Sequence, residues 1–250
     1  MSSPLFVCGC GHSGTTLLLA MLLRHSQCTG LRHETNAFLN ANESAAVEYF
    51  DSQLNTAHTY FVEKTPSHVH CIATMRAHWP NCKIVVCLRN PLDVTSSLVR
   101  RGYTLDAAIA RYARDNMAWL NSGQQVIVFR YEDLIANATA ALEQLCRQLD
   151  LPFEENMLRY HESNDMYFGT SSRRFEVYRD RQQQQNDRVE DFYKIGDEAN
   201  RLYRNYQLRL PLSDMNGKWR NTFDAAQCAQ VNSMLCDLLP RIGYAQISCS

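Results

Sequence analysis

The sequence predicts an α/β fold, in which helices flank a doubly wound parallel sheet within a single domain. Two observations support this prediction. Short apolar segments alternate with longer amphipathic segments from Leu5 to Leu149, which is typical of consecutive β-α units. A glycine-rich turn also follows the first apolar segment and precedes the first helix. The 250 residues suffice for one such domain, and we find no internal repeat or convincing boundary that would divide them.

The individual elements follow from local patterns in chain order. Lys83–Leu88 is a continuous apolar strand, as expected for a parallel sheet that is covered on both faces. Pro66 ends the preceding strand, because proline cannot donate to a sheet ladder. Asn90 and Pro91 are typical of the first residues of a helix. The expected strands are 5–8, 61–65, 83–88 and 125–130, and the expected helices are 15–24, 44–57, 66–78, 91–101, 104–120, 131–149 and 223–242.

The periodic pattern weakens from His161 to Pro211, a polar and basic stretch that contains a run of four glutamines at 182–185. We expect mobile loops there, with one helix near 197–206. We interpret the stretch 161–211 as a lid or a substrate-facing segment of the domain 1–250. An earlier segment, 27–36, is also polar.

Composition and charge argue against several classes of function. The formal net charge of −1 gives no global attraction to nucleic acid or to an anionic membrane. The apolar run Leu17–Leu23 is too short to span a bilayer, and Met1–Leu5 shows no secretory signal. The ten cysteines include no CxxC pair, so we expect reduced thiols in a cytoplasmic protein. We expect no metal site, because His68 and His70 are two residues apart and do not share a helix face.

The strongest local signal is Gly9–Thr16, here called the P-loop, between the first strand and the first helix. Gly9 and Gly14 have the spacing of a Walker A motif, and the backbone N–H groups of such a turn converge on an anion. The Walker lysine is missing, because Thr15 and Thr16 stand where lysine and a hydroxyl residue should be. A magnesium-bound nucleoside triphosphate needs that lysine, so this P-loop suits a different anion.

A second anion-binding pattern follows the strand at 83–88. Arg89 comes directly after this strand, and Ser97 lies about two turns into the next helix. An arginine can hold a phosphate through two parallel hydrogen bonds, so Arg89 and Ser97 could clamp a second phosphate. The alternative is a local ion pair between Arg89 and Asp93.

These two motifs, in this order, resemble those of the sulfotransferases. The P-loop resembles the family's 5′-phosphosulfate loop, and Arg89 with Ser97 resembles its 3′-phosphate motif. Arg130–Leu134 is similar to the family's Tyr-Glu-Asp segment after a later strand, and Lys218-Trp219 is similar to its C-terminal cofactor contact. The resemblance covers nearly the whole chain and is closest to the tyrosylprotein sulfotransferase-like branch.

The resemblance implies the donor 3′-phosphoadenosine 5′-phosphosulfate (PAPS), which has no γ-phosphate and needs no metal. It implies Glu34 as the general base, with His33 as the rival, and Lys64 as the residue that neutralises charge on the leaving oxygen. The chain departs from the family at His12, where lysine or arginine usually precedes Ser-Gly-Thr-Thr. The residues implied to contact PAPS, or its product 3′-phosphoadenosine 5′-phosphate (PAP), are His12, Ser13, Gly14, Thr15, Thr16, Arg89, Ser97, Arg101, Tyr131, Lys218 and Arg220.

Each of these side chains also has a purely structural interpretation when the resemblance is set aside. Glu34 could be a surface acid, Lys64 an exposed lysine at a strand end, and Tyr131 a packed core residue. Lys218 and Arg220 could belong to a solvated basic turn. The predicted roles therefore depend on whether the fold brings these residues together.

We expect a sulfotransferase that moves a sulfuryl group from PAPS to a hydroxyl, or an amine, of a small molecule or saccharide. The acceptor should lie against the segments Arg32–Asn42 and 161–211. Protein tyrosine is an alternative acceptor. Two alternatives belong to other classes: a P-loop kinase or nucleotide hydrolase, which the missing lysine opposes, and a non-catalytic nucleotide-binding protein, which His12 leaves open.

Overall fold

A computed structural model describes residues 2–39, 42–54, 57–163, 165–167, 172–184 and 197–246. Within these ranges five parallel strands form one sheet in the order β2-β3-β1-β4-β5, with β1 at its centre. The strands are β1 (Ser3–Gly9), β2 (Cys28–Gly30), β3 (Tyr60–Lys64), β4 (Lys83–Leu88) and β5 (Ile127–Arg130). The predicted α/β fold with a doubly wound parallel sheet is therefore confirmed.

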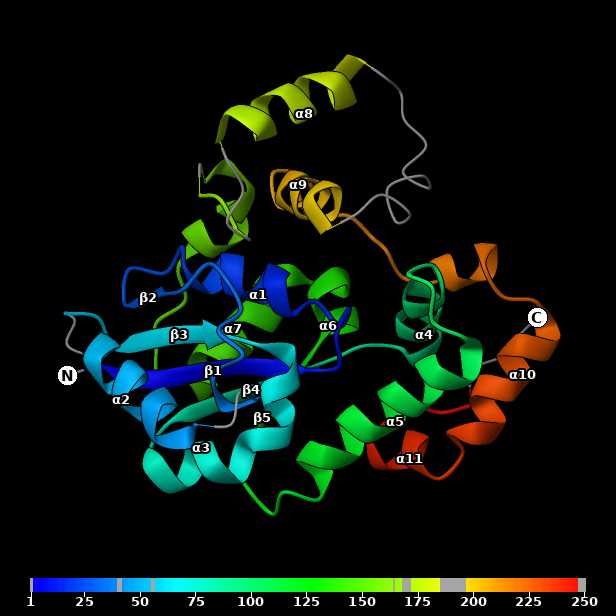
Figure 1. The fold of residues 1–250 in the computed structure, drawn as a ribbon, viewed down its shortest axis with the longest axis horizontal. Helices are drawn as coiled ribbons and strands as arrows, with labels where there is room; N and C mark the ends of the chain where they lie inside the picture. Colours follow the sequence, from blue (N-terminus) through cyan, green and yellow to red (C-terminus); the bar gives the residue numbers. More distant parts are fainter. Residues whose placement is uncertain are drawn as a thin grey trace.

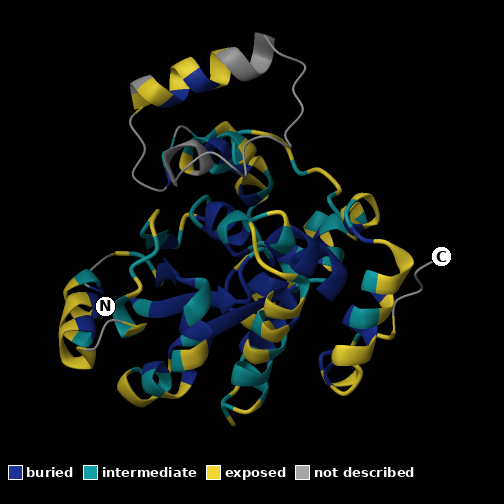
Figure 2. Ribbon diagram, turned by 45° about the vertical axis from the view of Figure 1, so that its right-hand side comes forward, coloured by how far each residue is buried: buried dark blue, intermediate teal, exposed yellow. Residues whose placement is uncertain are grey.

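Helices cover both faces of the sheet, with α1 and α7 on one side and α2 and α3 on the other (Figure 1). Figure 2 shows that the strands are buried beneath helices whose outer sides are exposed. The helices are α1 (Thr15–Leu22), α2 (Glu43–Gln53), α3 (Ile72–His78), α4 (Pro91–Val99), α5 (Leu105–Leu120), α6 (Tyr131–Ala136), α7 (Ala138–Gln148), α8 (Ser172–Gln184), α9 (Asp197–Gln207), α10 (Ala225–Met234) and α11 (Leu238–Arg241).

Alternate residues of β1 pack on opposite faces of the sheet, because successive side chains of a strand point in opposite directions. Leu5 and Val7 belong to a core with residues of α1 and α7. Phe6 and Cys8 belong to a second core with residues of α2 and α3. A third core joins α4, α5, α10 and α11 beyond the end of β4. The central strand is thus buried on both sides, which fixes the position of the turn that follows it.

Several elements differ from the sequence prediction. The helix expected at 66–78 begins as a 3₁₀-helix, Pro66–Cys71, and continues as α3. The polar segment 27–36 contains the short edge strand β2, which pairs with β3 alone and so lacks the apolar pattern of a central strand. The helix expected at 131–149 divides into α6 and α7, because Asn137 adopts extended backbone angles and its side chain caps α7 at Ala140 N. The helix expected at 223–242 likewise divides into α10 and α11.

The stretch 161–211 contains two helices, α8 and α9, which form a layer on the α1 side of the molecule (Figure 1). The helix predicted near 197–206 is confirmed as α9, whereas the expectation of loops alone over 172–184 is wrong. Few apolar residues mark α8, with Phe175 and Tyr178 among its buried side chains, so its periodic signal is weak. The remainder of the predicted loop, 168–171 and 185–196, lies outside the described residues.

A buried carboxylate holds the C-terminal part of the chain against α4. Asp93 is 3% exposed, and its two oxygens accept hydrogen bonds from Gly217 N at 3.0 Å and Trp219 N at 3.4 Å. The alternative partner suggested by the sequence, Arg89, binds elsewhere. Asp93 therefore fixes the turn that presents Lys218.

We expect Asp93→Ala to lower the free energy of unfolding by about 1–3 kcal/mol, because it leaves the N–H groups of half-buried Gly217 and buried Trp219 without their acceptor. Urea denaturation would measure this change. Asp237→Ala is a matched control, since Asp237 is exposed at the start of α11. Equal stability of the two variants would contradict the assigned role of Asp93.

Candidate active site

A cavity of about 1390 Å³, here called the main cavity, opens beside the residues that follow β1 and β4. In parallel α/β sheets such positions, at the carboxyl ends of strands, are where ligands bind. The volume exceeds the range of about 300–1,000 Å³ that small-molecule sites usually have. The predicted site residues in its wall are His12, Gly14, Thr15, Thr16, Glu34, Arg89, Ser97, Arg101, Tyr131 and Lys218.

The P-loop leads directly into the N-terminus of α1. Gly14 has φ 91° and is the N-cap residue, and no side chain caps the helix. A Cβ atom at Gly14 would lie 3.1 Å from the Tyr131 ring, so glycine allows both the turn and the close approach of the ring. The N-terminal N–H groups of α1 face the cavity side with the positive end of the helix dipole, which favours an anion there.

Arg89 connects three parts of the cavity wall. Its guanidinium donates to His12 O at 3.4 Å and to Met215 O at 2.7 Å, and it lies 4.1 Å from the centroid of the Tyr131 ring. Its Nε is buried and has no hydrogen-bond partner among the described residues. Arg89 is therefore held by main-chain carbonyls while one of its donors is left for a ligand.

His12 is the point where the chain departs from the family pattern, and its imidazole is surrounded by cations. Its Nδ1 lies 3.0 Å from Ser97 Oγ. Burial lowers the pKa of His12 well below its ordinary value, and four guanidinium groups lower it further. Those groups belong to Arg101, Arg204, Arg111 and Arg89. His12 is thus neutral near pH 7, and the positive charge of the site comes from arginines around it.

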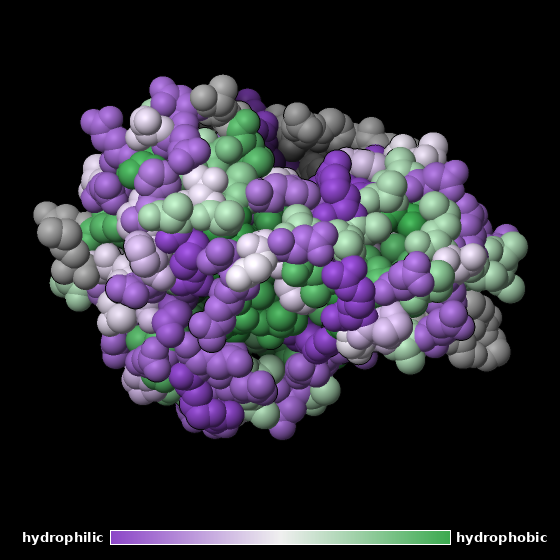
Figure 3. Space-filling model, turned by 90° about the horizontal axis from the view of Figure 1, so that it is seen from below, coloured by the Kyte–Doolittle hydropathy of each residue, from purple (hydrophilic) through white to green (hydrophobic). Residues whose placement is uncertain are grey.

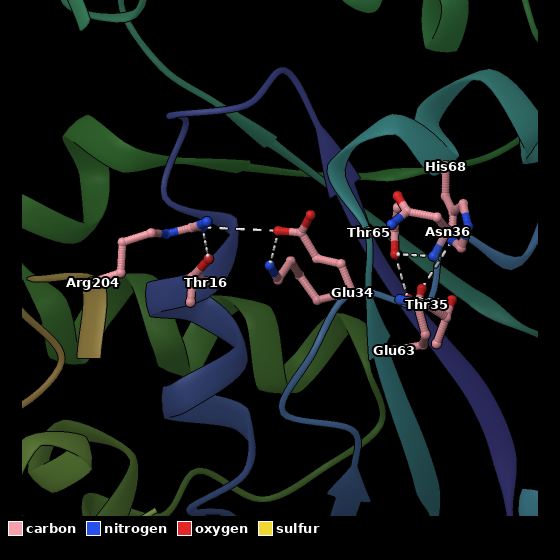
Figure 4. Close-up of polar contacts among 9 residues, drawn as sticks. Thr16, Glu34, Thr35, Asn36, Glu63, Thr65, His68 and Arg204 are labelled. Atoms are coloured by element: carbon pink, nitrogen blue, oxygen red, sulfur yellow. Dashed lines mark hydrogen bonds and ion pairs between the residues drawn. The ribbon is translucent and has the colours of Figure 1, made fainter. Parts of the chain in front are cut away.

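Glu34 and Lys64 form an ion pair at the edge of the main cavity. Lys64 Nζ lies 2.5 Å from Glu34 Oε1, and Arg204 Nη2 lies 3.8 Å from the same oxygen (Figure 4). The lysine side chain is 1% exposed, whereas that of Glu34 is 29% exposed. Burial lowers the pKa of Lys64, the Glu34 carboxylate opposes this effect, and the charge of Arg204 adds to it. Lys64 is therefore a buried cation that depends on Glu34 as its partner.

A buried polar network holds the backbone next to Glu34. Glu63 is 1% exposed, and its carboxylate accepts hydrogen bonds from Thr35 Oγ1 at 3.0 Å and Thr65 Oγ1 at 2.6 Å and contacts His68 Nδ1 at 3.0 Å (Figure 4). Burial would raise the pKa of Glu63, but these hydrogen bonds outweigh it and the pKa is lowered. Glu63 is ionised and fixes the residue that follows Glu34.

Four predicted residues lie outside the wall of the main cavity. Lys64 reaches the site through Glu34, and Ser13 is buried in the P-loop. Arg220 lies over the Trp219 ring, 4.4 Å from its centroid. His33 is exposed and lines a smaller hollow of about 430 Å³, in whose wall Glu34 also lies.

Sequence reasoning did not identify Arg204 and Arg111 as cavity residues or Glu63 as part of the site. Arg204 lies 188 positions after its partner Thr16, and no local pattern marks that pairing. Glu63 could have been noticed, because a charged residue in a buried strand needs a partner.

The described residues also bear on metals and membranes. They include no group of three or more histidine, cysteine, aspartate or glutamate side chains that could hold a metal ion. They include no helix that is long and apolar enough to cross a membrane. On the face opposite α8 and α9, apolar and hydrophilic side chains are interspersed (Figure 3).

A sequence model of the sulfotransferase family matches residues 32–155, about half of the chain. The chain belongs to this family. The matched range contains Glu34, Lys64, Arg89 and Ser97, which the fold brings to the main cavity or into contact with its wall. The family assignment and the geometry therefore concern the same side chains.

Two relatives of this sulfotransferase family member share about a quarter of its residues in the aligned region. An uncharacterised protein of Aquifex aeolicus is 24% identical over 206 residues, which cover 64% of this chain and 27% of that protein. A Caenorhabditis briggsae protein, provisionally named a protein-tyrosine sulfotransferase, is 24% identical over 193 residues, which cover 63% of this chain and 69% of that protein. The matched region thus spans about a quarter of the first relative.

Solved sulfotransferase structures share the fold. The sulfotransferase domain from the curacin biosynthetic pathway has a TM-score of 0.63 and 20% identity, and the match covers 99% of both chains. A sulfotransferase from Mycobacterium avium has a TM-score of 0.58 and 10% identity, and the match covers 98% of this chain and 78% of that one. The structural match to the curacin-pathway domain thus covers nearly the whole chain, beyond the residues 32–155 that the family model matches.

We expect the free energy of unfolding to fall as the pH is lowered below about 6.5, because unfolded His12 then binds a proton that the folded state excludes. His12→Asn should remove this part of the pH dependence. Asparagine is the suitable substitution, since residue 12 has φ 73° and asparagine tolerates that conformation. Urea denaturation of both proteins between about pH 5 and pH 7 would measure it. Parallel pH profiles would show that His12 is not a neutral buried group.

Proposed function

We propose that this protein transfers a sulfuryl group from PAPS to a hydroxyl of a small molecule or saccharide. The observation that supports this function best is the contact between Glu34 and Lys64, at the edge of a cavity whose P-loop lacks a Walker lysine. A carboxylate paired with a buried ammonium, beside an anion cradle, offers both a proton acceptor and a counter-charge for a leaving group.

The residues present fit an anionic nucleotide donor. Ser13 Oγ and Arg89 Nε are buried without hydrogen-bond partners among the described residues, and the N-terminus of α1 has no side-chain cap. Buried polar atoms in native proteins are nearly always satisfied, so these donors suit oxygen atoms of a ligand. Tyr131, held under the Arg89 guanidinium, offers an aromatic surface for a base.

When bound, PAPS would supply a sulfuryl group already activated by its bond to the 5′-phosphate. Ser13, Thr15 and Thr16 would hold the 5′ end, while Arg89, Ser97, Arg101 and Lys218 would bind the 3′-phosphate side. Glu34 Oε2, which has no partner among the described residues, would accept the proton of the acceptor hydroxyl. Lys64 Nζ would counter the negative charge that develops on the leaving oxygen.

The hollow beside Glu34 supports a small acceptor. Its volume of about 430 Å³ lies at the lower end of the range for small-molecule sites. Its wall combines small residues with polar and aromatic ones, which suits a compact polar molecule with hydroxyl groups. The wall is formed by His33, Glu34, Thr35, Ala37, Asn42, Ala45, Ala46 and Tyr49.

A protein tyrosine is the second candidate acceptor. The supporting observation is the similarity to the Caenorhabditis briggsae protein whose name includes protein-tyrosine sulfotransferase. A tyrosine side chain would also present a hydroxyl to Glu34. An acceptor panel that contains sugars, phenols and tyrosine peptides would separate the two candidates.

We expect PAP to bind more tightly than ATP with magnesium, because the P-loop has no lysine for a γ-phosphate. Arg89→Ala should weaken PAP binding about tenfold or more, through loss of a charge-assisted contact. Arg147→Ala is the matched control, since Arg147 is exposed on α7. Isothermal calorimetry would measure each affinity. Tighter binding of ATP would favour a kinase or nucleotide hydrolase instead.

We expect Glu34→Gln and Lys64→Met to lower turnover at least about 100-fold, because they remove the proton acceptor and the counter-charge. PAP affinity should stay within about threefold of the wild-type value. Transfer of labelled sulfate to the acceptor panel would measure turnover. If His33→Ala loses activity while Glu34→Gln keeps it, His33 is the base. Tight PAP binding without transfer to any acceptor would favour a non-catalytic protein.

A further inference from the structure

Arg204 reaches the candidate active site from α9, outside the sheet and its flanking helices. Its Nη2 donates to Thr16 Oγ1 at 2.9 Å and lies 3.8 Å from Glu34 Oε1 (Figure 4). One guanidinium group thus touches both the end of the P-loop and the proposed base. The side chain is about 29% exposed and lines the main cavity.

The P-loop itself supplies no cation at this point. The position before Ser13-Gly14-Thr15-Thr16 holds His12, whose lowered pKa keeps it neutral. The charge of Arg204 contributes to that lowered pKa, so the guanidinium lies within electrostatic range of the imidazole. Before an anion binds, the positive charge beside the N-terminus of α1 therefore comes from Arg204 and the other arginines, not from the side chain at position 12.

The backbone of α9 is fixed beside Arg204. Asn205 is 1% exposed, and its amide group exchanges two hydrogen bonds of 2.6 Å with the backbone of Tyr167. Asp165, which precedes Tyr167 by two residues, forms an ion pair of 2.9 Å with Arg32. Arg32 in turn precedes Glu34 by two residues. The segment that orders α9 is thus also tied to the loop that bears Glu34.

The several N–H donors of an arginine side chain suit anion binding at this position. A guanidinium has five N–H donors in a planar fork, so Arg204 can keep its bond to Thr16 and still bind an anion through two parallel hydrogen bonds. Glu34 also contacts Arg204 but lies closer to Lys64. An incoming anion would replace the contact between Arg204 and Glu34, which is longer than the bond between Arg204 and Thr16.

We propose that Arg204 takes the place of the missing P-loop cation and binds the anionic 5′ end of the nucleotide donor. This inference rests on the proposed function, because it assumes a nucleotide with a 5′-phosphate in the main cavity. It assigns α9 a direct part in donor recognition. It also explains how a neutral His12 is compatible with an anion-binding P-loop.

Calorimetry with two nucleotides tests the proposal. PAP carries both a 3′- and a 5′-phosphate, whereas adenosine 3′-monophosphate lacks the 5′ group. The wild-type chain should prefer PAP, and Arg204→Gln should reduce that preference about tenfold or more. Arg204→Lys, which keeps the charge without the planar fork, should give an intermediate preference. Arg201→Gln is the matched control, because Arg201 is exposed on the same helix.

The ratio of the two affinities separates a local effect from a displaced helix. Loss of the PAP preference with retained binding of adenosine 3′-monophosphate would support the proposal. An unchanged ratio in Arg204→Gln would overturn it, while the proposed function would stand if PAP still binds more tightly than ATP with magnesium. A wild-type chain that binds neither adenosine nucleotide would overturn the proposed function and, with it, this role of Arg204.

Discussion

The ammonium group of Lys64 is the constraint around which the site is arranged. A charged group this far from water is costly unless a partner and hydrogen bonds compensate it. Glu34 supplies the partner, and the Glu63 network holds the backbone that follows Glu34. Because β3 is parallel to β1 and adjacent to it, Lys64 lies at the same edge of the sheet as the P-loop. The position of Glu34 thus follows from sheet topology and from one buried charge.

The positive charge of the site is local, since the whole chain has a net charge of −1. Arginines converge on His12 from separate parts of the fold: Arg89 follows β4, Arg111 belongs to α5 and Arg204 belongs to α9. Their mutual repulsion is tolerable where an anion is bound among them. Such an arrangement depends on several elements being in place together, so the proposed donor binding would be linked to the folding of α9.

Much of the fold could be predicted from the sequence, because its signals are local. The apolar run at 83–88 and the glycine turn after β1 each determine their own structure, and both were identified. The edge strand β2 was missed because it pairs on one side only. The sequence also placed Lys64 and Arg89 at strand ends, where the structure has them, but it did not predict the contacts that they make with Glu34 and with the main-chain oxygens of residues 12 and 215. Arg204 could not be predicted, because its place depends on how Asn205 docks against Tyr167.

Arg89 binds main-chain carbonyl oxygens at residues 12 and 215, not the side chains at those positions. Every amino acid provides the same carbonyl group, so the anchorage of Arg89 is indifferent to which side chains stand there. A substitution at residue 215, or one at residue 12 that tolerates its φ of 73°, would therefore leave the guanidinium in place. Histidine at position 12 is compatible with this anchorage because its main-chain oxygen, not its imidazole, accepts the hydrogen bond from Arg89.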